Sequence, residues 1–236
     1  MFLSAEWRDL VILNYAVDPA LLAGHVPPGT ILDSFKGTTY ISLVGFRFIK
    51  TRLLGFLQVP FHADFLEINL RFYVRRRIGG EDRRGVVFIS EIVPRRAIAA
   101  TARLIYGENY SCLPMKHRVM RSGVSKTAEY QWKLGGNWCT LRAEGTGTPA
   151  HAETASLEQY ITEHYWGYSK QPGKHALEYH VAHVPWRVWP VPHAEFVGDC
   201  SSLYGPEVNA VLRRAPDCAF IADGSSVIVH RGERIQ

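Results

Sequence analysis

The sequence lacks the long apolar run and the short catalytic motifs by which many classes of protein are identified. No stretch of about 18 apolar residues occurs, so no membrane-spanning helix is expected. Charged residues begin at Glu6, too early for the apolar region of a signal peptide. These absences favour a cytoplasmic protein with no membrane partner.

Motifs for nucleotides, serine hydrolases and metals are also absent. There is no GxGxxG segment between a strand and a helix, no P-loop and no GxSxG elbow. The four cysteines form no CxxC pair, and no HExxH pattern occurs. His180 and His183 are three residues apart in an expected strand, which places their rings on opposite faces. We therefore expect no cofactor, no metal site and four reduced thiols.

A strong bias of charge is missing too, since 27 Lys and Arg stand against 22 Asp and Glu. The arginines nevertheless occur in short clusters, at 75–77, 83–84, 95–96 and 213–214. A nucleic-acid-binding protein concentrates such charge on one face with aromatic residues between. Here several clusters lie beside Gly or Pro, where hairpins turn and helices start, so no nucleic-acid partner is expected.

What the sequence does contain is a series of segments of alternating polarity, separated by Gly, Pro and Asn. Helices are expected from Asp18-Pro19 to Gly24, at 94–106 and at 156–164. Strands are expected at 9–17, 30–35, 38–50, 65–77, 85–92, 116–122, 125–134, 137–144, 177–183, 186–196, 218–222 and 227–231. The excess of strands favours a β-rich α+β fold, in which one large antiparallel sheet is curled or closed with a few helices outside it. We expect a single domain over residues 1–236.

The segment 65–77 is the most informative strand, because its two faces differ sharply. One face is apolar, and the other carries Glu67, Asn69, Arg71, Tyr73 and Arg75. In a sheet with one solvated side, the polar face would be exposed. In a curled sheet it would line a cavity, where Glu67 and Arg71 could hold opposite ends of a small molecule. The alternation leaves both interpretations open.

A second candidate is Lys116, which follows the expected helix at 94–106. A lysine amine becomes nucleophilic when a nearby cation or desolvation lowers its pKa. Arg118 would share a strand face with Lys116, so such a shift is conceivable. Two exposed basic side chains on an edge strand would explain the same pattern.

A set of short segments resembles the YqjF-like proteins, a bacterial family with a domain of unknown function. These segments run in order to about residue 195 and comprise Trp7-Arg8-Asp9-Leu10, Val26-Pro27-Pro28-Gly29 with Leu32-Asp33, Tyr40-Ile41-Ser42-Leu43-Val44-Gly45-Phe46-Arg47, Glu67-Ile68-Asn69-Leu70-Arg71-Phe72-Tyr73-Val74, Gly85-Val86-Val87-Phe88-Ile89-Ser90, Thr162-Glu163-His164-Tyr165 and His183-Val184-Pro185-Trp186.

That family is similar to the acetoacetate-decarboxylase-like superfamily. The resemblance implies a cone-shaped, largely antiparallel β-barrel with outer helices and an inner cavity. In the decarboxylases a lysine after a Gly-x-Pro-type turn forms a Schiff base, and a second lysine beside it lowers its pKa. By this resemblance Met115 occupies the first lysine position and Lys116 the second, so the usual Schiff-base lysine is missing.

The resemblance also turns the polar face of segment 65–77 inward and adds candidates from the family's motifs. The catalytic candidates are Lys116 and Glu67, and the ligand-binding candidates are Arg71, Tyr73, Glu163, Tyr165 and His183. Helix capping and packing are alternative roles for the last three.

Two hypotheses follow for the function. The first is a protein that binds a small carboxylate- or carbonyl-bearing ligand in a barrel cavity, with Arg71 as the carboxylate partner. This hypothesis includes a lyase-like reaction without the usual Schiff-base lysine. The alternative is a non-catalytic ligand sensor or an oligomeric interaction module, and a homo-oligomer is compatible with both. The sequence does not decide between an enzyme and a binding protein.

Overall fold

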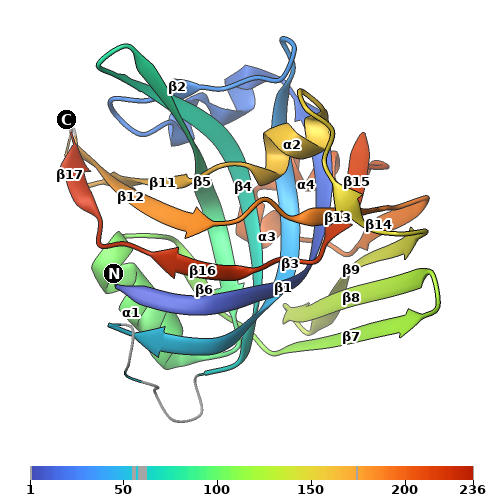
Figure 1. Ribbon diagram of the computed structural model, residues 1–236. Helices are drawn as coiled ribbons and strands as arrows, with labels where there is room; N and C mark the ends of the chain where they lie inside the picture. The colour runs from blue at the N-terminus through green and yellow to red at the C-terminus, as the bar shows by residue number, and fades with distance from the viewer. Residues whose placement is uncertain (1, 55–56, 58–62, 174, 236) are drawn as a thin grey trace.

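A computed structural model describes residues 2–235 apart from 55–56, 58–62 and 174 (Figure 1). Its strands form one sheet of 13 strands and a second sheet of four. None of the helices in this described part is long and apolar enough to cross a membrane.

The main sheet contains β1 (Leu3–Val17), β2 (Ile31–Leu32), β3 (Thr39–Leu53), β4 (Phe65–Ile78), β5 (Glu81–Val93), β6 (Tyr110–Cys112), β10 (Ala150–His151), β11 (Trp166–Gln171), β12 (His175–His183), β13 (Arg187–Pro190), β15 (Cys218–Ala222), β16 (Ser226–Val229) and β17 (Glu233–Ile235). The second sheet contains β7 (Met115–Ser122), β8 (Ser125–Leu134), β9 (Asn137–Thr146) and β14 (His193–Val197). The helices are a 3₁₀ helix (Pro19–His25), α1 (Arg96–Tyr106), α2 (Leu157–Thr162), α3 (Ser201–Tyr204) and α4 (Pro206–Leu212).

The pairings of the main sheet return to the strand from which they start. β1 pairs with β3, β3 with β4, and β4 with β5. β5 pairs with β11, β11 with β12, β12 with β16, and β16 again with β1 (Figure 1). The β5–β11 pair is parallel and the other pairs of this ring are antiparallel. The expected β-rich fold with a curled, largely antiparallel sheet is thus confirmed.

The orientation of β4 decides between the two interpretations of its polar face. Glu67 is 3% exposed, Asn69 2% and Arg71 7%, so this face lies inside the ring. The apolar face of the same strand is buried in the main hydrophobic core, as Ile68 and Leu70 show. The strand is therefore buried on both sides, and the interpretation that its polar face is in solvent is wrong.

Local signals in the sequence placed most elements correctly. Asp18 caps the 3₁₀ helix by accepting a hydrogen bond from the Ala20 amide at 2.8 Å, and Ser156 caps α2 through the Gln159 amide at 3.1 Å. Gly107, with a φ of 65°, ends α1 in the left-handed conformation that glycine adopts readily.

Some features differ from expectation. The turn between 30–35 and 38–50 forms at Phe35 and Thr38, but Ile31–Leu32 pairs with β4 rather than with the strand that follows the turn. The expected strand at 186–196 is divided between β13 in the main sheet and β14 in the second sheet. The elements β6, β10, β11, β17, α3 and α4 were not expected, and each spans only two to seven residues, too few to show a period.

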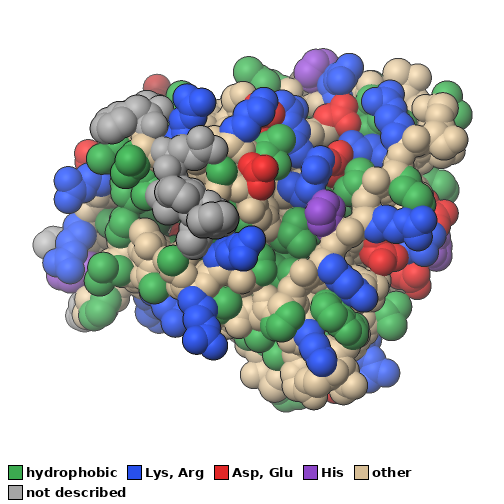
Figure 2. All heavy atoms as spheres, turned by 90° about the horizontal axis from the view of Figure 1, so that it is seen from below, with side chains coloured by type: hydrophobic (Ala, Val, Ile, Leu, Met, Phe, Trp, Pro, Cys, Tyr) green, Lys and Arg blue, Asp and Glu red, His purple; other side chains and the backbone are tan. Residues whose placement is uncertain are grey.

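The arginine clusters at 75–77 and 83–84 belong to the hairpin between β4 and β5. Arg76 and Arg83 both pair with Glu178, at 3.1 and 2.8 Å, and Arg84 pairs with Asp33 at 2.8 Å. The clusters thus lie at a hairpin end, as their neighbouring glycines indicate. Figure 2, seen from below the view of Figure 1, shows Lys and Arg side chains spread over the face, with acidic ones in a few groups.

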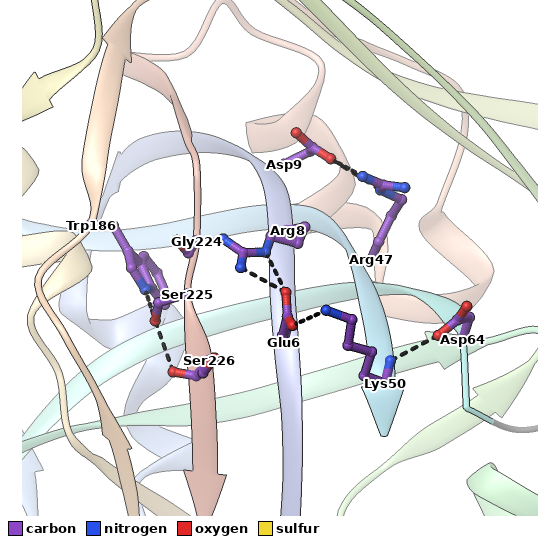
Figure 3. Close-up of polar contacts among 10 residues, drawn as sticks. All are labelled: Glu6, Arg8, Asp9, Arg47, Lys50, Asp64, Trp186, Gly224, Ser225 and Ser226. Atoms are coloured by element: carbon purple, nitrogen blue, oxygen red, sulfur yellow. Dashed lines mark hydrogen bonds and ion pairs between the residues drawn. The ribbon is translucent and has the colours of Figure 1, made fainter. Parts of the chain in front are cut away.

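Lys126 of β8 joins the second sheet to the main one. Its side chain is 7% exposed, and its Nζ lies 2.8 Å from Asp9 Oδ1 and 3.0 Å from Asp223 Oδ1. Asp9 sits at an irregularity of β1 with a φ of 57° and also accepts hydrogen bonds from Arg47 (Figure 3). Burial alone would raise the pKa of Asp9, but the hydrogen bonds and charges of Lys126 and Arg47 together have a larger, opposite effect. The pKa of Asp9 is therefore below its ordinary value.

We predict that Lys126→Met destabilises the protein by about 3 kcal/mol, because it leaves two partly buried carboxylates without their shared cation. The control is Lys133→Met, since Lys133 lies exposed on the same strand. That change should stay within about 0.5 kcal/mol of wild type. Denaturant unfolding measures both variants, and equal effects would contradict the bridging role of Lys126.

Candidate functional site

A cavity of about 210 Å³ lies inside the ring of strands. Most of its wall is apolar, with Phe46, Phe48, Phe88 and Trp186 among the large side chains. The polar residues that line it include Glu67, Asn69, Arg71, Glu91, Thr51, Thr101, Tyr106, Glu108, Tyr110, Thr162, His164, Tyr179 and His183. An apolar wall with a few convergent polar groups is typical of a small-molecule site.

Three carboxyl groups meet at one end of this cavity, which we call the acid end. Glu67 comes from β4, Glu91 from β5, and Glu108 from the turn between α1 and β6. Asn69 Nδ2 donates to Glu67 Oε1 at 3.1 Å, and Tyr110 OH donates to Glu67 Oε2 at 3.3 Å. Tyr179 OH donates to Glu108 Oε1. The donors recorded for these carboxyls are thus neutral.

Burial disfavours the charged form of all three carboxyl groups. It raises the pKa of Glu67 to about 8 and of Glu108 to about 7, although the hydrogen bonds from Asn69 and Tyr179 act in the opposite direction. The pKa of Glu91 also lies well above its ordinary value, because of burial and then the charges of Glu108 and Glu67. The acid end therefore holds protons near neutral pH, which suits general acid and base chemistry.

Arg71 marks a different part of the cavity, on the same strand as Glu67. Its Nη2 donates to the Ile161 carbonyl at 3.4 Å, but no described residue accepts a hydrogen bond from its Nε. His164 lies nearby, fully buried, and neither of its ring nitrogens has a partner among the residues described. Burial, and next the charges of Arg84 and Arg71, hold the pKa of His164 well below its ordinary value. Arg71 is thus the cationic side chain of the described cavity wall.

An irregularity in β5 brings two of its side chains into the cavity. Leu70 of β4 is opposite Ser90, but the next residue, Arg71, is opposite Phe88, so β5 has an extra residue at this point. Phe88 and Glu91 are three residues apart, which would put them on opposite faces of a regular strand. The bulge lets both line the cavity.

Three of the residues expected from the sequence line the cavity together, namely Glu67, Arg71 and His183. Two others pack behind the lining histidines. The ring of Tyr73 lies 4.7 Å from that of His164, and the ring of Tyr165 lies 4.8 Å from that of His183.

Glu163 does not line the cavity. It ends α2 and accepts a hydrogen bond from Gln159 Nε2 at 3.3 Å. This is the helix-capping position that was the alternative role for it.

Lys116, the other catalytic candidate beside Glu67, does not line this cavity. It is exposed on β7, in the second sheet, with its Nζ 4.3 Å from the centre of the Trp138 ring. The physical reason is that the chain after α1 passes the cavity before it reaches Lys116. Glu108 and Tyr110 enter the cavity, and β7 begins only afterwards at Met115.

The lining residues at the acid end that were not among the sequence-based candidates include Glu91, Glu108, Tyr110 and Tyr179. Glu91 offered one signal, because it is a charged residue within the apolar run of an expected strand. Glu108, Tyr110 and Tyr179 come from segments that approach β4 only because of the way the strands of the main sheet pair.

Comparisons with known proteins agree with this fold. The uncharacterized protein YqjF of Bacillus subtilis (strain 168) is 25% identical over 214 residues, which cover 89% of this chain and 85% of YqjF. The acetoacetate decarboxylase of Legionella pneumophila superposes with a TM-score of 0.69 at 14% identity, over 100% of this chain and 88% of that one. MppR, an enduracididine biosynthesis enzyme solved in complex with pyruvate, has a TM-score of 0.69 at 12% identity, over 100% and 91% of the two chains. At such identities the structural likeness shows the fold.

The family that matches by sequence is DUF2071, described as an uncharacterized conserved protein. The match extends over residues 4–226 and so includes every side chain of the acid end as well as Arg71. Since this is nearly the whole length of the sequence, the chain belongs to the DUF2071 family.

Proposed function

We propose that the cavity binds a small ligand that carries a carboxylate or a carbonyl group, with Arg71 as the partner of that group. The observation that carries the proposal is the state of the Arg71 side chain. It is 7% exposed, and its Nε has no acceptor within the described structure. A buried charge without a partner is costly, and the planar guanidinium matches a carboxylate with two parallel hydrogen bonds.

The apolar part of the cavity wall indicates the chemical nature of the remainder of the ligand. Phe46, Phe48, Phe88 and Trp186 offer apolar surface, which would cover a hydrocarbon portion. The fold relative MppR was solved with pyruvate, a small oxo acid. This supports a ligand class of small carboxylic acids and oxo acids.

Any reaction in this cavity would follow acid and base chemistry. The described lining residues include no lysine, so an imine between protein and substrate is not part of the proposal. Glu67 and Glu108, with pKa values of about 8 and about 7, can each give or take a proton near neutral pH. A lyase-like step would use these two groups for proton transfer while Arg71 holds the carboxylate.

A prediction for Arg71 uses hexanoate and hexanamide as probes, which differ in charge but little in shape. Wild-type protein should bind hexanoate more tightly than hexanamide in isothermal titration calorimetry. Arg71→Met should weaken hexanoate binding by about tenfold or more, the loss of one charge-assisted pair, and change hexanamide binding little.

The matched control is Arg118→Met, because Arg118 lies exposed on β7 and outside the cavity wall. It should bind hexanoate as the wild type does. Equal hexanoate affinities for wild type and a folded Arg71→Met variant would contradict the proposed function.

A further prediction concerns Glu67 and the pH dependence of the free energy of unfolding. Glu67 keeps its proton up to about pH 8 in the folded protein, whereas its ordinary pKa is 4.5. As the pH rises between these values the unfolded chain ionises first, so burial of Glu67 increasingly disfavours folding. Glu67→Gln removes this effect. Its gain in unfolding free energy over wild type should be larger near pH 8 than near pH 5, by about 1 kcal/mol or more.

Denaturant unfolding at both pH values measures this difference. Glu153→Gln is the control, since Glu153 is exposed and does not line the cavity. Its effect should be the same at both pH values. A Glu67→Gln effect that is independent of pH, or larger near pH 5, would show that Glu67 is ionised in the folded protein.

A further inference from the structure

We propose that the ligand also carries a protonated amine, held at the acid end by Glu91, Asn69 and Glu67. The preferred ligand class would then be an amino carboxylate whose two charges lie several ångströms apart. This inference rests on the proposed function, because Arg71 is taken to hold the carboxylate. It is carried by a separate set of atoms.

Those atoms are two buried acceptors that receive no hydrogen bond from any described residue. They are Asn69 Oδ1 and Glu91 Oε2, on side chains that are 2% and 1% exposed. Both side chains line the cavity, and their residues are directly opposite each other in the pairing of β4 with β5. Buried acceptors require a donor, and an ammonium group offers three N–H donors and no acceptor.

The polar neighbours of the other carboxyls point to the same kind of ligand. Tyr110 and Asn69 both donate to Glu67, and Tyr179 donates to Glu108. These hydrogen bonds favour the ionised form of Glu67 and Glu108, against the effect of burial, so a nearby cation could complete their ionisation. The acid end lacks only a positive charge.

The charges of the cavity wall also favour the binding of a cation. The described cavity wall carries three glutamates and one arginine, so ionising all three glutamates would leave an excess of negative charge in an apolar surrounding. A bound ammonium would offset part of this excess and favour ionisation.

The spacing along β4 selects the length of the ligand. Asn69 and Arg71 are two residues apart, which is roughly 7 Å of extended chain, and Glu67 lies two residues farther from Arg71, at roughly 13 Å. An α-amino acid holds its two charges on adjacent carbons and is short for either spacing. A chain with the amine at the far end from the carboxylate could span them.

Three probes of similar length test the inference by isothermal titration calorimetry near neutral pH: 6-aminohexanoate, hexanoate and hexylamine. Wild-type protein should bind 6-aminohexanoate at least about tenfold more tightly than hexanoate. Glu91→Gln should remove most of this preference, so that its affinities for 6-aminohexanoate and hexanoate become similar. Glu129→Gln is the control, because Glu129 lies on β8 and does not line the cavity.

A second measurement follows the protons. Titrations in buffers of different ionisation enthalpy should show that 6-aminohexanoate releases protons when it binds, as the ammonium drives the carboxyls to ionise. Proton uptake, or equal affinities for 6-aminohexanoate and hexanoate, would overturn the inference and leave the carboxylate site intact. If none of the probes bound, the proposed function itself would fail.

Discussion

The ring of strand pairings turns the polar side of β4 toward the interior, and the candidate site depends on this orientation. A strand buried on both faces needs partners for Glu67, Asn69 and Arg71 inside the fold, and the described residues supply them only in part. The donors from Tyr110 and Tyr179 reach the carboxyls, while Arg71 Nε keeps no acceptor among the described residues. Buried polar groups that remain without partners are rare in folded proteins, and a ligand is the physical explanation that we favour.

The second sheet contains two lysines on neighbouring strands whose surroundings differ. Lys126 faces the main sheet and is enclosed between Asp9 and Asp223, where it ties the two sheets together. Lys116 lies on the neighbouring strand β7, with its side chain exposed over Trp138. The buried lysine thus has a structural role, and the charged residues of the described cavity wall are arginine and glutamate.

Local sequence signals were sufficient for most elements and for half of the site. Alternating polarity located β4, and together with the family resemblance it placed Glu67 and Arg71 in the cavity. It could not place Glu91, because the bulge in β5 breaks the alternation on which such a prediction relies. Glu108 and Tyr179 were out of reach for another reason. Glu108 precedes β6, which pairs with β5, and Tyr179 lies on β12, which is joined to β5 through β11. No local pattern encodes these pairings.

The cavity is proposed to receive a carboxylate at Arg71, and a crystal structure of the protein with 6-bromohexanoate tests this most directly. The anomalous signal of bromine fixes the position and direction of the ligand. We predict one molecule inside the ring of strands, with its carboxylate hydrogen-bonded to the Arg71 guanidinium. A molecule bound only outside the ring, or one bound inside with its carboxylate turned away from Arg71, would contradict the account.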